Sequence, residues 1–205
     1  LPAFAVAHVL ARRRFVGKTL LDAVIHLPLV IPPVVTGYLL LLAFGRKGPI
    51  GAFLERAFGF MFAFRWTGAA LAAAIMGFPF LVRAIRRSIE AVDRRDEKAA
   101  ASLGASPFWV RLTVTLPLAL PGLIAGRVIC FAKALGEFGA TITFVSNIPG
   151  ETQTLSSAIY GLMQVPGGEA GIWRLAAVAV AISLAALLFS EWLVRRHPTR
   201  HGEDG

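Results

Sequence analysis

Residues 97–117 read EKAAASLGASPFWVRLTVTLP and separate two strongly apolar parts of the chain. The alanines from Ala99 onward are good helix formers, and Gly104 is a residue type at which helices commonly end. Ser106 offers an N-cap hydroxyl, and Pro107 fits the first turn of a second helix. The stretch therefore predicts two short helices joined by a tight turn, and we call residues 94–117 the elbow.

The turn of the elbow is followed at once by two large aromatic side chains, Phe108 and Trp109. Surface aromatics of this kind are typical anchors of protein interfaces. A polar helical segment that presents them between apolar segments predicts a docking point for a soluble partner.

The composition places the chain among membrane proteins. It has 205 residues, of which 56% are hydrophobic and 16% charged, with a mean hydropathy of +0.67. Apolar runs of roughly 17–25 residues mark membrane-spanning helices. Four such runs are found, at residues 27–44, 66–82, 116–135 and 172–193. Pro28, Pro32 and Pro33 are expected to break the first run, and Pro79 is expected to interrupt the second.

A fifth apolar run, residues 1–11, is too short to cross about 30 Å of hydrocarbon. It ends in Arg12, Arg13 and Arg14, so its charges follow the apolar residues, whereas those of a signal peptide precede them. We interpret this run as the tail of a first span whose beginning is absent from the sequence.

The formal net charge of +9 is explained by basic residues in cytoplasmic loops rather than by nucleic-acid binding. One set of alternate loops, which includes the elbow loop and the C-terminal tail, holds fourteen Lys and Arg residues, and the other set holds five. This difference predicts that the elbow and the C-terminus are cytoplasmic.

Three charged residues lie in or at the end of the third apolar run: Arg127, Lys133 and Glu137. Charges within a span are candidates for a transport pathway or for helix contacts. A structural alternative for Lys133 and Glu137 is an ion pair, because residues four apart share a helical face. Arg127 is predicted to face a pathway or another helix.

Gly122 and Gly126 form a small-residue pair suited to close helix packing.

Residues 136–171 are rich in Gly, Thr, Ser and Asn, with apolar stretches too short to span. Residues 152–163 are predicted to form a short helix. Neutral hydroxyl and amide donors suit the transport of an oxyanion, because its hydrogen bonds must be weak enough for the anion to leave again. The candidate pathway residues are Thr141, Thr143, Ser146 and Asn147. The alternative is an outer loop whose polar residues are simply solvated.

Neither a catalytic nor a metal site is predicted. The sequence contains no phosphate-binding loop that ends in Lys and Ser or Thr. The four histidines lack metal-ligand spacing, and the single cysteine, Cys130, lies in an apolar run. The acidic residues from Glu90 to Glu97 alternate with arginines and are interpreted as a solvated helix end.

The elbow resembles the cytoplasmic EAA loop of the permeases of binding-protein-dependent ABC importers. That pattern is Glu-Ala-Ala, three residues, Gly, nine residues, an aliphatic residue, one residue, and Leu-Pro. The matching positions are Ala99, Ala100, Gly104, Val114, Leu116 and Pro117. The position of the Glu is taken by Lys98, with Glu97 one residue earlier.

Two further segments are similar to molybdate permeases within this family: HLPLVIPPVVTGYLLL at residues 26–41 and GEFGATITFVSNIPGETQT at residues 136–154. The likeness extends over nearly the whole chain. Sulfate and thiosulfate permeases share a related Glu-Phe-Gly and Gly-Glu-Thr segment, so these anions, and tungstate, remain alternatives to molybdate.

The resemblance implies an all-α, polytopic type I ABC importer transmembrane domain at residues 1–196, with about five core spans, and a disordered cytoplasmic tail at 197–205. It implies a homodimer in the inner membrane, two ABC ATPase subunits, and a periplasmic or lipoprotein molybdate-binding protein. No cofactor is expected on this chain, because ATP and Mg²⁺ would be used by the ATPase. The implied ATPase-coupling residues are Glu97, Lys98, Ala99, Ala100, Gly104, Phe108, Trp109, Leu116 and Pro117.

Two other classes of protein are compatible with an apolar chain of this kind. An ion-coupled secondary transporter would use Arg127, Lys133 and Glu137, but it gives the elbow no task, and inverted repeats are not visible. A membrane scaffold without transport would not need spans broken by proline.

Overall fold

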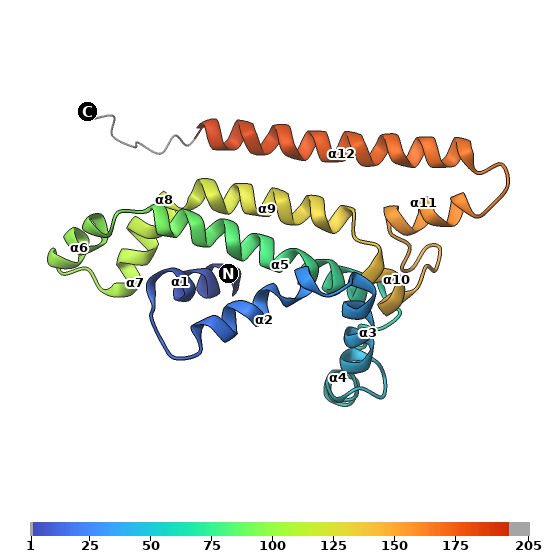
Figure 1. Cartoon of the computed structure of the whole chain (residues 1–205), viewed down its shortest axis with the longest axis horizontal. Helices are drawn as coiled ribbons and strands as arrows, with labels where there is room; N and C mark the ends of the chain where they lie inside the picture. The colour runs from blue at the N-terminus through green and yellow to red at the C-terminus, as the bar shows by residue number, and fades with distance from the viewer. Residues whose placement is uncertain (1, 197–205) are drawn as a thin grey trace. The chain divides into compact units, whose positions relative to one another are not determined.

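The computed structural model describes residues 2–196, and the predicted disordered tail, 197–205, lies outside the described residues. All regular structure in the described part is helical (Figure 1). The helices are α1 (Pro2–Arg12), α2 (Lys18–Val30), α3 (Pro33–Phe44), α4 (Pro49–Phe58), α5 (Trp66–Ala91), α6 (Arg94–Ser102), α7 (Pro107–Val110), the π-helical turn η1 (Arg111–Thr115), α8 (Leu116–Leu118), α9 (Leu120–Leu135), α10 (Gly139–Val145), α11 (Leu155–Met163) and α12 (Glu169–Arg196).

The contacts divide the chain into two compact units. Unit 1 comprises Leu1–Asp22, Phe80–Ile129 and Ala186–Gly205, and therefore contains α1 and the elbow. Unit 2 comprises Ala23–Pro79 and Cys130–Ala185, and contains α3, α4, α10 and α11.

Unit 1 is held together by apolar side chains of α1, α5 and α7. Leu10, Ile85, Ile89 and Val110 are buried, and burial of such side chains is the main favourable term in folding. The start of α9 approaches α5 closely, because a Cβ atom added at Gly126 would lie 2.8 Å from Cβ of Ala84. The small-residue packing predicted for this helix is therefore confirmed.

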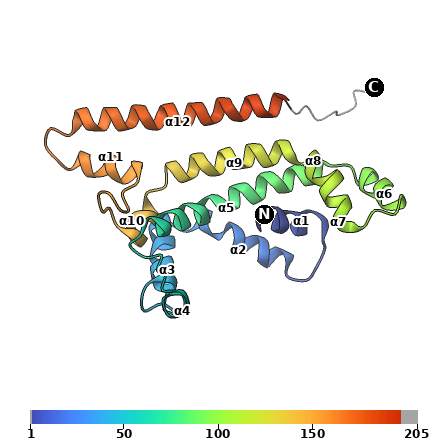
Figure 2. The ribbon, with the colours of Figure 1, turned by 180° about the vertical axis from the view of Figure 1, so that it is seen from behind.

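Unit 2 is centred on the packing of α10 against α3, which lie side by side in both ribbon views (Figures 1 and 2). Leu40 of α3 and Phe144 and Val145 of α10 belong to one buried apolar cluster, which also contains Met76 of α5. The short helix predicted within 152–163 is confirmed as α11. It begins at Leu155, because Thr154 forms a capping box with Ser157.

Two helices, Trp66–Ala91 and Glu169–Leu193, are long and apolar enough to cross a membrane. Two bent pairs raise the number to as many as four if each pair is one span. The first pair is α2 and α3, which bend by 114° at their junction. Pro32 and Pro33 lie at this break, as predicted. The helical part begins nine residues earlier than the predicted boundary at 27, and Pro28 lies inside α2 without breaking it.

The proline in α5 does not break the helix. Pro79 was expected to interrupt the second span, but α5 is continuous from Trp66 to Ala91, so that prediction is wrong. Proline removes one backbone donor, and here Met76, Pro79 and Val82 are all buried, so packing on both sides of the proline maintains the helix. The third predicted span, residues 116–135, is not one straight helix. It falls in the second bent pair, Pro107–Leu118 and Leu120–Leu135, which bends by 67°.

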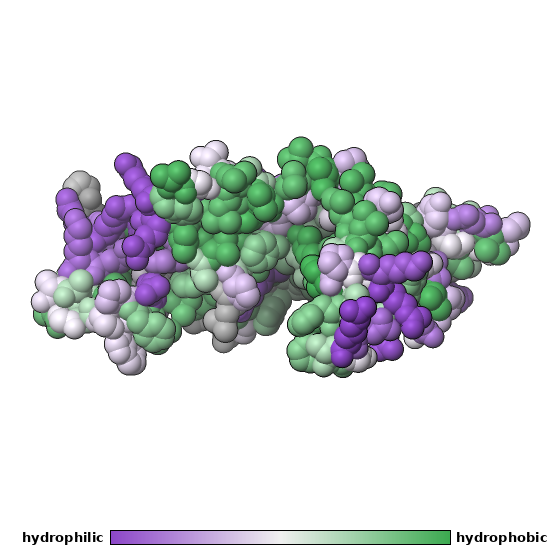
Figure 3. Space-filling model, turned by 90° about the horizontal axis from the view of Figure 1, so that it is seen from below, coloured by the Kyte–Doolittle hydropathy of each residue, from purple (hydrophilic) through white to green (hydrophobic). Residues whose placement is uncertain are grey.

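The distribution of exposed side chains fits a membrane protein. None of the apolar window of α12 is buried within the chain, and its exposed side chains include Leu184, Leu188 and Phe189. Hydrophilic residues instead gather in two places in Figure 3, at the left end over the elbow and in a second patch to the right of centre. The elbow thus has the surface of a segment in water, and α12 has that of a segment in lipid or against another helix.

Candidate functional site: the elbow and the polar segment around α10

The turn of the elbow is a complete helix-ending motif. The amide of Gly104 donates to the carbonyl of Ala101 at 3.0 Å, and the amide of Ala105 donates to that of Ala100 at 3.2 Å. This pair of bonds defines a Schellman motif, which requires a left-handed residue after the helix. Gly104 has φ 87° and fills that position. The predicted glycine stop is confirmed, and α6 ends at Ser102 as a result.

The second helix of the elbow begins as predicted. The Ser106 hydroxyl accepts a hydrogen bond from the amide of Trp109 at 3.5 Å, and Pro107 occupies the first helical position. The helix then loosens into the π-helical turn η1, where the amide of Leu116 reaches back to the carbonyl of Arg111. Pro117 has no amide to donate, and π-helical turns appear where the regular ladder is interrupted. This turn was not predicted from the sequence.

The carboxylate of Glu97 ties the elbow to α1 and to η1. Its Oε1 accepts a hydrogen bond from Arg12 Nη2 at 3.1 Å and another from the Thr115 hydroxyl at 2.8 Å. Arg12 also donates to the carbonyl of Val92 at 2.9 Å. The Arg12 and Glu97 side chains are only 12% and 19% exposed. The interpretation of Glu97 as part of a solvated helix end is therefore wrong, because a residue 85 positions away in sequence covers its carboxylate.

The aromatic residues of the elbow are exposed as predicted. Phe108 is 63% and Trp109 56% exposed, and their rings meet edge to face with centroids 6.4 Å apart. Leu103, which is not among the coupling residues predicted from the sequence, is 88% exposed beside Gly104. Three large apolar side chains thus surround one turn, a combination typical of docking surfaces. The signal in the sequence was the position of Leu103 next to the helix-ending glycine.

The remaining coupling candidates also lie on the elbow, at different depths. Lys98 and Ala99 are exposed, and Ala100 is half-buried. At the far end of the elbow Pro117 is exposed and Leu116 is half-buried. All of these residues lie on the consecutive helices from α6 to α8 in unit 1. The predicted ATPase-coupling residues therefore belong to one continuous helical segment.

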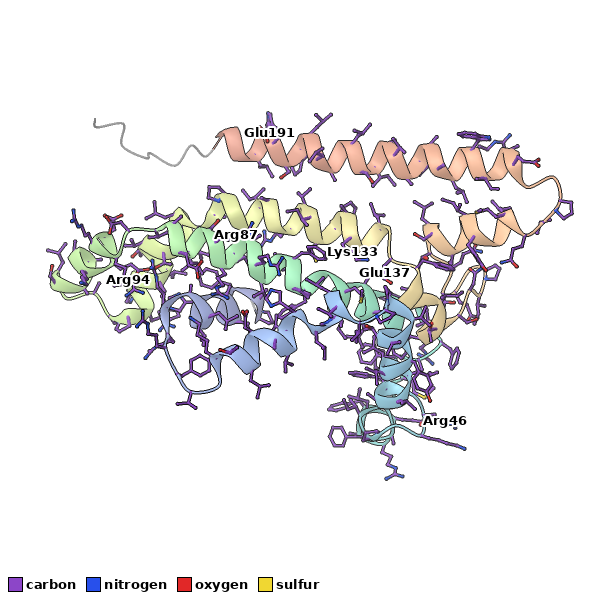
Figure 4. All side chains as sticks on the ribbon, in the orientation of Figure 1. Arg46, Arg87, Arg94, Lys133, Glu137 and Glu191 are labelled. Atoms are coloured by element: carbon purple, nitrogen blue, oxygen red, sulfur yellow. The ribbon has the colours of Figure 1, made fainter. Side chains whose placement is uncertain are left out.

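The charges at the end of α9 form the ion pair that was the structural alternative. Lys133 Nζ lies 2.9 Å from Oε2 of Glu137, and the two are adjacent in Figure 4. The other carboxylate oxygen of Glu137 accepts the amide of Ala140 at 2.9 Å, and Glu137 is 1% exposed. The buried carboxylate therefore joins the end of α9 to the start of α10.

Arg127 differs from Lys133. It is exposed on α9, and no ion pair or hydrogen bond of its side chain is found among the side chains that the structure describes. A guanidinium on an otherwise apolar helix needs water, an anion or another helix around it.

The four polar candidates near α10 do not share one face. Thr141 is buried, and its hydroxyl donates to the carbonyl of Phe138 at 2.9 Å. Thr143 donates to the carbonyl of Gly139 at 2.8 Å and is half-buried. Ser146 is exposed at the end of α10 with φ 66°. Thr141 is therefore a packing residue within this chain, whereas Ser146 lies at an open surface.

Asn147 is the most unusual of the four. Its Nδ2 donates to the carbonyl of Ser157 at 3.2 Å, which links the loop after α10 to α11. Its Oδ1 is buried without a hydrogen-bond partner in the described part of the chain. Buried polar atoms are rarely left unsatisfied, so this oxygen can accept a hydrogen bond from a water molecule or from a donor group. Among the described residues, no group of His, Cys, Asp or Glu is arranged to hold a metal ion.

Known proteins match nearly the whole length of the chain. The family model described as "Binding-protein-dependent transport system inner membrane component" matches residues 3–197. The chain is 58% identical over 196 residues to the molybdenum transport system permease protein ModB of Escherichia coli K12, covering 96% of this chain and 86% of that protein. It is 55% identical over 201 residues to ModB of Haemophilus influenzae, covering 98% and 88%.

A sulfate permease is also related. The sulfate transport system permease protein CysT of Salmonella typhimurium is 38% identical over 188 residues, covering 90% of this chain and 66% of that protein.

Solved structures share the fold at low sequence identity. The inward-facing MetNI methionine ABC transporter matches with a TM-score of 0.73 at 15% identity, over 97% of this chain and 85% of the matched chain. A bacterial alginate ABC importer matches with a TM-score of 0.62 at 16% identity, over 95% and 71%. The fold is therefore that of an ABC importer transmembrane domain, and the chain belongs to the family of binding-protein-dependent transport system inner membrane components.

Proposed function

We propose that this chain is the permease subunit of an ATP-driven importer that carries molybdate across the cell membrane. The observation that carries the proposal is the 58% identity to a molybdenum permease over nearly the whole chain. It is supported by an elbow that presents three exposed apolar side chains around a Schellman turn. Membership of the family makes the chain a membrane component of a binding-protein-dependent system.

In this proposal two copies of the chain form the pathway, and two cytoplasmic ATPase subunits each hold one elbow. A periplasmic or lipoprotein binding protein delivers the anion at the outer face. ATP and Mg²⁺ are used by the ATPase subunits, and this chain is non-catalytic. The arrangement is supported by a structure of similar fold, a bacterial alginate ABC transporter in complex with a periplasmic protein that holds an alginate pentasaccharide.

The elbow is the coupling device in this scheme. Leu103, Phe108 and Trp109 enter the ATPase groove, and Lys98 and Ala99 lie at its rim. Because Arg12 and Thr115 hold the carboxylate of Glu97, we assign Glu97 to fixing the elbow on α1 and η1 rather than to contacting the ATPase. A displacement of the elbow by the ATPase is then passed to α1 and, through η1, to α9. Such rigid-body transitions between two states are the usual mode of coupling.

The anion pathway is proposed to use weak, neutral donors together with a diffuse positive field. Arg127 supplies the field from the exposed side of α9, and the exposed hydroxyl of Ser146 supplies a donor. Asn147 donates through the second hydrogen of Nδ2, because the first is bonded to the carbonyl of Ser157. Thr143 contributes less, because its hydroxyl already donates to the carbonyl of Gly139. Thr141 contributes packing instead, since it is buried and its hydroxyl is bonded to the backbone.

Transport by reconstituted vesicles tests the proposal. The permease is incorporated with its ATPase and binding protein, and uptake of radioactive molybdate is measured with ATP inside. We expect uptake that requires both ATP and the ATPase. Uptake that persists without the ATPase indicates a secondary transporter, and absence of uptake in the complete system contradicts the proposal.

Sulfate is the second candidate, favoured by the 38% identity to the sulfate permease of Salmonella typhimurium. Competition distinguishes the anions. Unlabelled molybdate and tungstate are expected to suppress radioactive molybdate uptake at concentrations at which sulfate has little effect. Equal competition by sulfate assigns the chain to sulfate import instead.

A further inference from the structure

A basic pocket lies within unit 1, between α1 and the elbow. It has a volume of about 460 Å³. Its cationic lining consists of Arg12 and Arg13 at the end of α1, Arg94 and Lys98 on α6, and Arg111 on η1. Figure 4 labels Arg94 at this end of the molecule. Neither the transport pathway nor the exposed aromatic surface of the elbow accounts for this pocket.

The charge of the pocket is not balanced within the chain. Glu97 is the one carboxylate among the lining residues, and it is already bonded to Arg12 and Thr115. The neighbouring Asp93 does not line the pocket and caps the amide of Arg95 at 2.8 Å. The positive charge that remains attracts an anion, and the pocket walls reduce its screening by water.

Buried nitrogen atoms in the same place lack a hydrogen-bond partner in the part of the chain that the structure describes. They are Nε of Arg12, which is a donor, and Nδ1 of His8, and both residues line the pocket. Arg111 uses Nε to bond the carbonyl of Pro107 at 2.8 Å, which fixes its guanidinium plane and leaves its two terminal nitrogens. Fixed guanidinium groups match the geometry of phosphate-type oxygens.

The pocket also has an apolar wall, formed by Val9, Pro107 and Val110. Val9 belongs to the apolar helix α1, which leads directly into Arg12, Arg13 and Arg14. A charged pocket at the end of an apolar helix is the setting in which lipid headgroups bind at a membrane surface.

We propose that this pocket is an anion-binding site, separate from the transport pathway, that takes a tetrahedral oxyanion group of the phosphate type. The group comes either from the headgroup of an anionic phospholipid or from a free oxyanion in the cytoplasm. The negative charge of the bound group attracts the basic residues of α1, α6 and η1 that line the pocket. It therefore adds to the Arg12–Glu97 ion pair in holding these helices together. Occupancy therefore stabilises the position of the elbow on α1.

The first experiment uses the permease assembled with its ATPase, without nucleotide. Two variants remove two positive charges each: Arg13→Gln/Arg111→Gln within the pocket and Arg14→Gln/Arg95→Gln outside it. Retention of phosphatidylglycerol is counted by native mass spectrometry against a phosphatidylcholine background. Binding of radioactive inorganic phosphate is measured in phosphatidylcholine nanodiscs.

The pocket variant is expected to bind one of the two probes about tenfold more weakly than the parent, because charge-assisted hydrogen bonds are lost. The outside variant is expected to match the parent. A change confined to phosphatidylglycerol identifies a lipid headgroup as the source, and a change confined to inorganic phosphate identifies a free oxyanion. Equal behaviour of the two variants with both probes overturns the proposal.

A second measurement keeps every arginine and does not depend on the folding of those variants. Ala105→Cys places a thiol on the pocket wall, and its reaction with a small thiol reagent is followed by peptide mass, separately from Cys130. Phosphatidylglycerol or inorganic phosphate is expected to slow the reaction at least threefold. Overturning results are an unchanged rate with both probes, or a block that arises from ATPase assembly alone, which would assign the pocket to a protein contact.

Discussion

Arg12 and Glu97 lie 85 residues apart, yet Nη2 of Arg12 donates to Oε1 of Glu97 at 3.1 Å. The bond connects the end of the first described helix to the first helix of the elbow, and Thr115 adds a third element through the same oxygen. A partner that displaces the elbow must therefore move or break a largely buried ion pair. This gives the elbow a defined resting position in unit 1.

Loss of the Glu97 carboxylate should loosen the elbow. Glu97→Ala leaves Arg12, which is 12% exposed, without its carboxylate partner. We expect a loss of about 1.5–3 kcal/mol in stability, the range for hydrogen bonds to charged groups, together with weaker coupling of ATPase activity to transport. Thermal unfolding of the assembled complex and the ratio of ATP hydrolysed to molybdate imported measure the two effects.

Asp96→Ala is the matched control, because Asp96 is exposed on the same helix. Glu97→Gln should be intermediate, since its amide oxygen still accepts the Thr115 hydroxyl. Equal melting temperatures for Glu97→Ala and Asp96→Ala would show that the ion pair contributes nothing.

The turn at Gly104 gives a second prediction. Gly104 has φ 87° and open space around its missing Cβ, so Gly104→Val strains the backbone without a steric clash. The strain is about 1–2 kcal/mol. We expect the permease to insert and assemble while ATP hydrolysis becomes uncoupled from uptake. Gly104→Asn should retain more coupling, because Asn tolerates the left-handed region better.

Gly59→Val tests whether any such strain has this effect. Gly59 ends α4 with φ 62°, also with nothing close to its missing Cβ, but it lies in unit 2, away from the elbow sequence. Gly59→Val should remain coupled. Normal coupled uptake by Gly104→Val would remove the elbow from the coupling mechanism.

The proposed orientation can be measured by labelling. Ser102→Cys on the elbow should react with a membrane-impermeant thiol reagent only from the cytoplasmic side, and Ser146→Cys after α10 only from the outside. Both positions are exposed. The experiment is made in a Cys130→Ser background, since Cys130 is the only native cysteine. Labelling from the opposite sides reverses the topology drawn from the Lys and Arg distribution.

The anion pathway gives a fourth prediction. Arg127→Gln removes an exposed, unpaired charge from α9 and should lower molybdate uptake about tenfold or more, while the ATPase still binds. Thr143→Val should cause a smaller loss, and Thr141→Val should lower stability more than uptake because Thr141 is buried. Initial uptake rates in vesicles measure the effect on transport.

Arg174→Gln is the control for Arg127→Gln, because Arg174 is also an exposed arginine but lies on a different apolar helix, α12. If Arg127→Gln and Thr143→Val both transport at the parent rate, the pathway lies elsewhere. Residues 32–38, around the break between α2 and α3, are then the next segment to test.

Glu137 gives a prediction about folding rather than transport. Glu137→Ala removes the acceptor of both Lys133 and the amide of Ala140 from a site that is 1% exposed. Lys133 remains 32% exposed, so the cost is that of lost hydrogen bonds to a charged group, about 1.5–3 kcal/mol each, and the variant should be less stable than the parent. Glu151→Ala, at an exposed position in the next loop, should assemble like the parent. Normal thermal stability of Glu137→Ala would contradict the buried pairing.

The sequence by itself determined the local features of this protein. Apolar runs marked α5 and α12, Pro32 and Pro33 marked the break between α2 and α3, and Gly104, Ser106 and Pro107 marked the turn of the elbow. These predictions succeed because helix caps, left-handed turns and proline breaks depend on neighbouring residues. The sequence pattern of the elbow also identified the family, which the match over residues 3–197 bears out.

Only the tertiary structure decided how distant residues are paired and which polar groups are buried. Glu97 was expected in water because its sequence neighbours are charged, but Arg12 of another helix covers it. Pro79 was expected to interrupt a helix that buried packing keeps continuous. Thr141 and Ser146, five residues apart in one polar segment, are buried and exposed respectively. Each outcome depends on contacts made by the folded chain, which composition and spacing do not encode.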